Sequence, residues 1–245
     1  MTTVNPNHAE FKTQDAASYN PVAQSFDRFV TQLSAPVAAR LVALAGLAPD
    51  NHVLDVGAGT GIVALRAVAE MGPSGRVVGI DLSDGMLEVA RQNARGRGLA
   101  DRVEFRKMDA ESLDCKDGSF DAVVSLFALR HFPHPETALQ EMHRVLRPGG
   151  RLVLAVGSGA PWLSLVGLVH RLKLLPHVVR RFQGKQLVAC KFLDGMVAAY
   201  VPSSGKSEEA GWTHEHTHMQ QSVPAFIRAA GFQNIRSEWQ GQQSI

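Results

Sequence analysis

A regular alternation of short apolar runs with helical patterns between residues 51 and 157 constrains the fold most strongly. The short runs are rich in Val, Ile and Leu, and they predict strands at residues 52–56, 77–81, 103–106, 120–126 and 151–156. The segments between them predict helices at 61–71, after the cap residue Ser83, and from Pro135 onward. Such alternation is typical of βαβ units. The sequence therefore predicts an α/β fold, a Rossmann-like, doubly wound, mostly parallel sheet with helices on both faces.

The rest of the chain is expected to complete the same single domain, 1–245. Residues 1–50 predict N-terminal helices, including an amphipathic helix at 35–47, and 51–157 form the core. An insert at 158–221 is expected to form a helical cap between strand five and the last helix. Residues 222–245 predict that helix, at 222–230, and a strand around 234–239.

Composition excludes several functional classes. The formal net charge is only +2 and charged residues make up 20% of the chain, so no polybasic nucleic-acid surface is expected. Cys115 and Cys190 form no close pair, so neither a disulfide framework nor a zinc knuckle is indicated. The polar N-terminus lacks a secretory pattern, and a cytoplasmic protein is expected. The uncharged stretch 152–169 is broken at 157–161 by Gly and Pro, which favours strand, turn and helix over a transmembrane span.

A glycine-rich loop, Asp55-Val56-Gly57-Ala58-Gly59-Thr60-Gly61, separates the first predicted strand from the first predicted helix. Glycines there permit positive φ and let a ligand approach the backbone, although a tight turn without a ligand has the same pattern. The dinucleotide fingerprint needs a third glycine where this chain has Ile62. The loop is therefore of a different type.

Carboxylates follow the next two predicted strands. Asp81 stands at the end of strand two, where it could accept hydrogen bonds from both ribose hydroxyls or simply favour the following helix N-terminus. Asp109 and Ala110 follow strand three. Open α/β sheets bind ligands along this carboxyl edge, so these residues are candidates for one site.

Taken together, these motifs resemble the class I S-adenosylmethionine-dependent methyltransferases. The resemblance rests on the segments at 53–61, 79–83, 109–110 and 144–150, in that order. Phe127-Ala128-Leu129-Arg130 and Asp84-Gly85-Met86-Leu87 are most similar to the ubiquinone/menaquinone-biosynthesis C-methyltransferases. The resemblance covers roughly residues 35–157, plus 226–232.

The resemblance implies S-adenosyl-L-methionine as cofactor, with a role for each motif. Gly57, Gly59 and Thr60 would pass the methionine part, Asp81 would hold the ribose, Asp109 and Ala110 would meet the adenine, and Leu126 would approach the sulfonium. Asp55, Ala58, Leu82, Met86 and Ser125 complete the expected cofactor set. The function implied is methyl transfer to a small, lipophilic acceptor: quinone-, lipid- or natural-product-like. Leu126 departs from the quinone enzymes, which tend to have a small polar residue there.

Two other functions are consistent with the glycine loop. One is a nicotinamide-dependent oxidoreductase, which Ile62 disfavours. The other is a non-catalytic module that binds S-adenosylmethionine. A binding module would bind S-adenosylmethionine without turnover, which distinguishes it from an enzyme.

Several residues are candidates on the acceptor side. His131 could act as a general base, although it could also be a structural histidine. Tyr19 could fold over the cofactor or pack in the core. His214, His216 and His218 would share one face of an extended segment, where they could bind a metal, line a pocket or lie at the surface; no metal site is expected.

The insert from Pro161 to about Val201 contains an apolar run at 162–175, and it could form a pocket lid, an ordinary core helix or a peripheral membrane contact. The position of the run, after the carboxyl end of strand five, favours a lid that selects the acceptor.

Overall fold

The computed structural model describes residues 6–156 and 216–236. The chain divides into two compact units, Met1–Gly157 with Val223–Ile245, and Ser158–Ser222. The first unit contains the sheet and every cofactor residue expected from the sequence. The second unit lies outside the described residues apart from the start of the last helix, so the cap helix at 161–201 stays a prediction.

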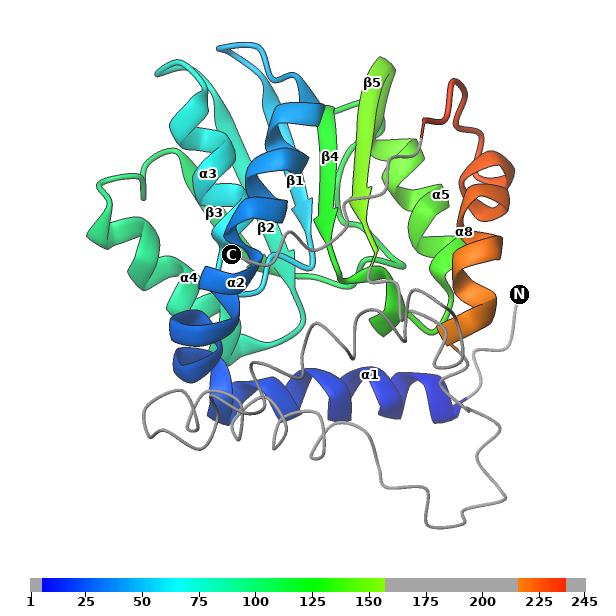
Figure 1. Cartoon of the computed structure of the whole chain (residues 1–245), viewed down its shortest axis with the longest axis horizontal. Coiled ribbons are helices and arrows are strands. Elements are labelled where there is room, and N and C mark those ends of the chain that lie inside the picture. Colours follow the sequence, from blue (N-terminus) through cyan, green and yellow to red (C-terminus); the bar gives the residue numbers. More distant parts are fainter. Residues whose placement is uncertain (1–5, 157–215, 237–245) are drawn as a thin grey trace, which may run out of the picture. The chain divides into compact units, whose positions relative to one another are not determined.

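A five-stranded parallel sheet forms the first unit, with strand order β3-β2-β1-β4-β5 (Figure 1). The strands are β1 (His52–Val56), β2 (Arg76–Asp81), β3 (Val103–Lys107), β4 (Phe120–Leu126) and β5 (Leu146–Ala155). Val53 of β1 pairs with Val77 of β2 on one side and with Ala122 of β4 on the other. The order reverses between β1 and β4, which is the position where open α/β sheets bind ligands at the carboxyl ends of their strands.

Helices connect the parallel strands and cover the sheet. Within the described residues, the longer helices are α1 (Pro6–Tyr19), α2 (Ala23–Ala45), α3 (Ile62–Glu70), α4 (Asp84–Gly96), α5 (Pro135–Val145) and α8 (His216–Ala229). Two short 3-10 helices join them, η1 (Asn20–Val22) and η2 (Leu129–His131). From β1, the connections through α3 and α4 add β2 and β3 on one side of the sheet. The connection through α5 joins β4 to β5 on the other side of β1. Right-handed connections therefore place α5 on the opposite face from α3 and α4.

The main core lies between the sheet and α2, α3 and α4. Fully buried residues of these helices include Leu41, Leu65 and Leu87, which pack on the sheet face that carries Val53 and Val124. Successive strand residues point to opposite faces, so Leu54 and Val123 are buried toward the other side. The sheet is thus buried on both faces, as a parallel sheet requires.

The predicted strands agree closely with the structure, with two differences. β5 begins at Leu146, and the expected turn at 147–150 is an irregularity within the strand, because Phe120 pairs with Leu146 while Ala122 pairs with Arg151. The extra residues of β5 must bulge outward, and Gly149 accommodates this with a φ of 80°. The strand expected around 234–239 is not seen at 234–236, and its remaining residues lie outside the described part.

The histidine series is also different from an extended segment. His216 and His218 lie in α8, which begins six residues before the predicted helix at 222, whereas His214 is outside the described residues. The chain is therefore helical and not extended at these two positions, so the condition for the one-face arrangement is not met there. In the described residues no cluster of three possible metal ligands occurs. None of the described helices is long and apolar enough to span a membrane.

Candidate functional site

The loop after β1 is fastened to the end of β2. The N–H groups of Gly57 and Ala58 both donate to the carbonyl of Ile80, at 2.9 and 2.8 Å. Gly57 has a φ of 71° and Gly59 a φ of 54°, values at which a side chain is strained. These contacts turn the loop across the carboxyl ends of the two central strands.

Gly59 and Asp81 meet at the centre of this edge. The N–H of Gly59 donates to Oδ2 of Asp81 at 2.9 Å, and the N–H of Ser83 donates to Oδ1 at 2.9 Å. A Cβ placed on Gly59 would have no atom of the described structure within 4 Å. Burial raises the pKa of Asp81, although the N–H groups of Ser83 and Gly59 oppose that rise. The loop therefore leaves open space over Gly59 beside a carboxylate that is fixed at both oxygens.

Asp55 is buried beneath the same loop. Its side chain is 1% exposed, and its Oδ2 accepts the N–H of Ala64 at 2.9 Å. Its Oδ1 has no hydrogen-bond partner among the described residues. Burial raises the pKa of Asp55 to about 7, against the lowering by the Ala64 N–H and with a further contribution from the charge of Asp81. A buried polar atom without a partner is rare and suggests a missing partner or a functional role.

Asp109 follows β3 on the same edge, and α1 reaches it. Oδ2 of Asp109 accepts Nζ of Lys12 at 2.7 Å, and Oε2 of Glu111 accepts the same Nζ at 2.6 Å. Burial works to lower the pKa of Lys12, but the hydrogen bonds to both carboxylates and their charges outweigh it, so the pKa is raised. Lys12 is thus a charged link between α1 and the loop after β3.

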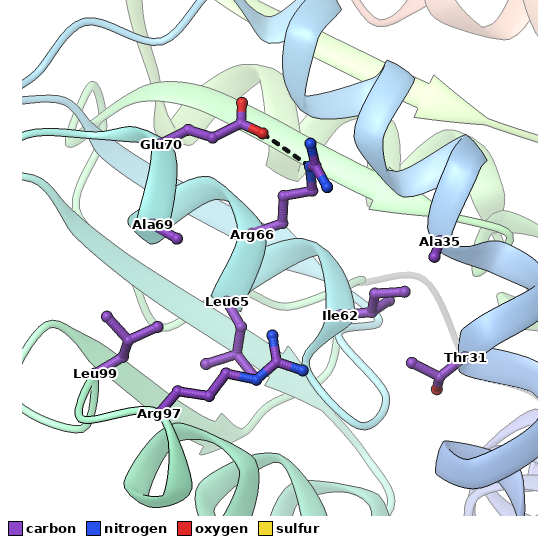
Figure 2. A pocket seen from close by; sticks show the side chains of 9 residues that line it. All are labelled: Thr31, Ala35, Ile62, Leu65, Arg66, Ala69, Glu70, Arg97 and Leu99. Atoms are coloured by element: carbon purple, nitrogen blue, oxygen red, sulfur yellow. Dashed lines mark ion pairs between the residues drawn. The ribbon is translucent and has the colours of Figure 1, made fainter.

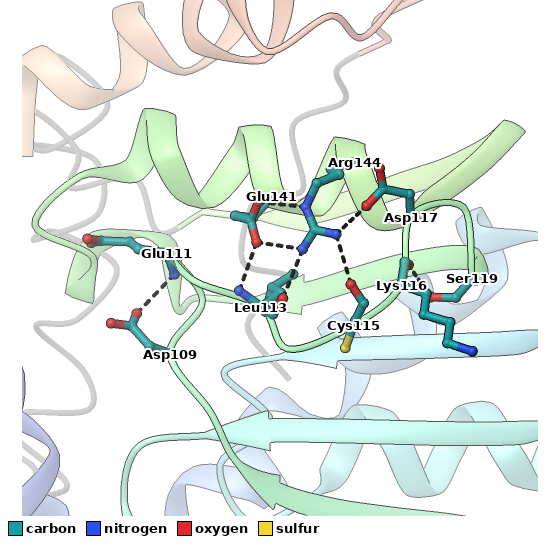
Figure 3. Close-up of polar contacts among 9 residues, drawn as sticks. All are labelled: Asp109, Glu111, Leu113, Cys115, Lys116, Asp117, Ser119, Glu141 and Arg144. Carbon is teal, nitrogen blue, oxygen red and sulfur yellow. Dashed lines mark hydrogen bonds and ion pairs between the residues drawn. The ribbon is translucent and has the colours of Figure 1, made fainter. Parts of the chain in front are cut away.

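An arginine of α5 fixes the rest of that loop. Figure 3 shows the guanidinium of Arg144 among Glu141, Asp117 and the carbonyls of Leu113 and Cys115. Hydrogen bonds to Glu141 and Asp117 raise the pKa of Arg144, so it stays charged. A planar guanidinium can satisfy several acceptors in one plane. The position of the Asp109 segment is therefore set by α5 on one side and Lys12 on the other.

The end of β4 supplies a buried hydroxyl and a strained residue. Ser125 is 1% exposed, and its Oγ donates to the carbonyl of Val56 at 2.7 Å, which ties β4 to β1. Phe127 has a φ of 61°, a conformation that an aromatic residue rarely adopts, and its N–H donates to the carbonyl of Ala155. Such strain gathers at functional sites, where surrounding contacts enforce it. Leu126 lies between these two residues and is partly buried.

His131 follows on η2 and faces α1. Its Nδ1 lies 3.1 Å from Oδ2 of Asp15, and its Nε2 lies 3.5 Å from the hydroxyl of Tyr19. Tyr19 also packs edge-on against Phe26. Its ring therefore takes part in packing, while its hydroxyl lies near His131 at the carboxyl edge. In Figure 1, α1 runs along the edge at which the strand arrows end.

Comparisons with known proteins agree with this geometry. Residues 54–154 match the family described as "Methyltransferase domain". Residues 54–154 form a class I methyltransferase domain. The chain is 40% identical over 137 residues to a ubiquinone/menaquinone biosynthesis C-methyltransferase of Ectopseudomonas mendocina, a match that covers 55% of this chain and 54% of the relative. A Pseudomonas putida protein of the same name is 42% identical over 113 residues, which are 46% of this chain and 44% of the relative.

A solved structure gives a similar result. A chain from a complex that contains the Haloferax volcanii Trm112 methyltransferase activator matches with a TM-score of 0.50 and 26% identity, over 59% of this chain and 60% of that chain. This chain spans about half the length of the curated relatives that it matches.

Within the methyltransferase domain, the expected cofactor residues fall into two groups. The partly exposed ones at the carboxyl edge are Gly57, Gly59, Asp81, Leu82, Asp109 and Leu126. The buried ones are Asp55, Ala58, Thr60, Met86, Ala110 and Ser125. Met86 packs with Ala23 and Val89 under α2, and the hydroxyl of Thr60 lies 3.0 Å from that of Thr31. The buried group therefore shapes and supports the edge.

A cavity of about 690 Å³ lies elsewhere on the methyltransferase domain, between α2, α3 and the segment after α4. Its lining includes Thr31, Ile62, Arg66, Arg97 and Leu99 (Figure 2). None of the expected cofactor residues lines it. The chemistry-bearing side chains are on the carboxyl edge, so the edge is the candidate site.

Proposed function

We propose that this chain is an S-adenosylmethionine-dependent methyltransferase with a small lipophilic acceptor. The observation that carries the proposal is the pairing of Gly59 and Asp81 at the carboxyl ends of β1 and β2, next to the switch point of the sheet. The Asp81 oxygens each accept one N–H and keep further lone pairs, which two ribose hydroxyls can use. Open space over Gly59 lets the rest of such a ligand approach the backbone.

The residues present fit this cofactor. Asp55 has a buried oxygen without a partner in the described structure, and Asp81 and Asp109 add carboxylates at the same edge. A ligand with a positive sulfur and an ammonium group suits such an acidic surrounding. When bound, S-adenosylmethionine would supply a methyl group on a positively charged sulfur. The protein would contribute by orienting the acceptor and excluding water.

A nicotinamide dinucleotide fits less well. Its fingerprint requires a glycine where Ile62 begins α3, so that the helix can approach closely. Ile62 instead packs against the main core. Ile62 therefore argues against the dinucleotide fingerprint at this loop.

The acceptor class rests on two supports. Relatives at 40% and 42% identity over about half their length are named as ubiquinone/menaquinone biosynthesis C-methyltransferases. The apolar run at 162–175 in the insert, outside the described residues, has the composition expected of a lipophilic lid. We therefore propose hydroquinone-like, lipid-like or similarly apolar acceptors.

Calorimetric titration of the full chain with S-adenosylhomocysteine and, separately, with NAD⁺ tests the cofactor. We expect S-adenosylhomocysteine to bind and Asp81→Ala to weaken it by roughly 2 kcal/mol, the range for hydrogen bonds to charged groups. Asp101→Asn, on the exposed surface, serves as the matched control. Equal affinities of wild type and Asp81→Ala, or tighter binding of NAD⁺, would refute the proposal.

The acceptor is tested by methyl transfer from labelled S-adenosylmethionine to a reduced, short-chain prenylated 1,4-naphthoquinone. Mass spectrometry of lipophilic molecules that co-purify with the chain provides a second acceptor class to assay. We expect labelled product from an apolar acceptor. Labelling of polar acceptors alone would contradict the lipophilic assignment while leaving the methyltransferase assignment intact.

A further inference from the structure

The imidazole of His131 is held between two elements that are far apart in sequence. Asp15 of α1 contacts its Nδ1 at 3.1 Å, and the two side chains are 24% and 29% exposed, respectively. Nε of Arg130 donates to Nε2 at 3.2 Å, and the Tyr19 ring packs edge-on against the imidazole with centroids 5.7 Å apart. Both ring nitrogens therefore have assigned partners.

These partners determine the tautomer. A guanidinium has only donors, so Nε2 of His131 must accept from Arg130 and cannot carry the proton. A carboxylate oxygen accepts, so the proton of the neutral ring lies on Nδ1 and points to Asp15. This leaves the Nε2 lone pair directed away from Asp15, toward Tyr19 and the exposed Arg130.

Charged groups face the ring from more than one element. Asp15 faces it from α1, and Asp81, at the end of β2, is close enough for the charge of His131 to act on its pKa. Arg130 is the opposing charge, and it lies on the exposed side, where solvent screens it. Tyr19 is the other titratable group that contacts the ring. The ring of His131 thus has a carboxylate contact on its Nδ1 side and a guanidinium contact on its Nε2 side.

We propose that Asp15 is a positioning residue that holds His131 as the proton acceptor of methyl transfer. The inference rests on the proposed function and narrows its substrate to acceptors that lose a proton: a hydroxyl group, or a ring carbon activated by one. The acceptor atom gains its bond to the methyl carbon as the sulfonium–methyl bond breaks, with that electron pair remaining on sulfur. The acceptor's proton passes to Nε2 of His131, which exchanges its contact with Arg130 for the acceptor. Asp15 then stabilises the imidazolium until the proton leaves to water.

The tautomer is tested without turnover. In the full chain labelled with ¹⁵N-histidine, long-range ¹⁵N–¹H spectra distinguish Nδ1–H from Nε2–H rings, and His131→Gln assigns the resonance. We expect Nδ1–H in wild type, and a shift toward Nε2–H in Asp15→Asn, whose amide can donate to Nδ1. Glu10→Gln is the matched control, since Glu10 is an exposed carboxylate on the same helix. An unchanged His131 tautomer in Asp15→Asn overturns the role of Asp15.

Kinetics with the reduced prenylated naphthoquinone test the consequence. We expect kcat to fall about 10- to 100-fold in Asp15→Asn, with the KM for S-adenosylmethionine and the melting temperature unchanged, because general-base catalysis is worth about 10²–10⁴-fold. Adding Asp15→Asn to His131→Ala should lower kcat no further, since the two act as one unit.

The two proposals fail in different ways. Wild-type chain that does not bind S-adenosylhomocysteine refutes the proposed function, whatever the histidine spectra show. Intact binding and turnover, with the same kcat in Asp15→Asn and wild type, refutes the role of Asp15 alone.

Discussion

Replacing Asp55 with asparagine removes a buried titratable group while nearly preserving its size. Burial raises the pKa of Asp55 to about 7 in the folded chain, against an ordinary value of 3.8. The folded state therefore holds this proton more tightly than the unfolded state. The stabilising contribution of the neutral carboxyl is complete below pH 3.8 and is lost as the pH rises toward about 7.

The size of the effect follows from this difference. Each pKa unit corresponds to about 1.4 kcal/mol, so the total loss of unfolding free energy is on the order of 4 kcal/mol. The part lost between pH 5 and pH 7 is about 2 kcal/mol by the same conversion, and the remaining few tenths of a kcal/mol are lost by about pH 8, because the group is half ionised at pH 7. Asparagine does not titrate, so the stability of Asp55→Asn relative to wild type should increase by about 3 kcal/mol from pH 5 to pH 8.

Urea unfolding followed by far-ultraviolet circular dichroism at pH 5, 6, 7 and 8 measures this difference. Asp101→Asn, an exposed substitution, should run parallel to wild type across the range. Parallel curves for Asp55→Asn and wild type would refute the raised pKa of the buried Asp55 carboxyl. We also expect Asp55→Asn to bind S-adenosylhomocysteine more weakly. Oδ1 of Asp55 has no partner in the described structure, and an unpaired buried carboxylate that lowers stability is expected where it contacts a ligand.

Three further predictions concern the edge and its supports. Gly59→Ala should lower the free energy of unfolding by only about 1–2 kcal/mol, because of the positive φ, yet weaken S-adenosylhomocysteine binding at least tenfold in a calorimetric titration. Gly57→Ala should impair folding, because its methyl group would collide with the side chain of Ala128, after β4. Lys12→Met should cost about 1–3 kcal/mol and speed hydrogen exchange along α1, and unchanged exchange would contradict the link. Arg144→Lys should cost about 2 kcal/mol in urea unfolding, well above Arg147→Lys, which loses one ion pair.

The sheet could be predicted from the sequence because its signals are local. The predicted bounds of β1 and β4 agree with the structure, and the Ser83 cap is confirmed by its hydrogen bond to the N–H of Met86. The sequence predicts that β5 begins at residue 151, five residues after its observed start, since Pro148 and two glycines predict a turn. Pairing with β4 overrides that local preference and leaves a bulge.

The candidate site was predictable only in outline. Motif order placed Gly59 and Asp81 at one edge, and the structure joins them by a hydrogen bond. The sequence does not reveal that Ser125 is buried and bonded to the carbonyl of Val56, because burial depends on packing between strands distant in the chain. The strain at Phe127 is equally hidden, since nothing in a phenylalanine predicts a positive φ.

Apart from Tyr19, which was a candidate from the sequence, the contacts that α1 makes are the feature that sequence reasoning missed most fully. His8, Lys12, Asp15 and Tyr19 recur at helical spacing, so a polar stripe was available as a signal. Each contacts a loop about a hundred residues away, at His134, Asp109, Glu111 or His131, and no local pattern specifies such partners. A helix attached through charges rather than a broad apolar face is held by contacts that salt and charge-changing substitutions weaken. Because Asp15 and Lys12 lie on the same helix, loosening the Lys12 link should also loosen the contact that orients His131, which couples docking of α1 to the chemistry proposed for the edge.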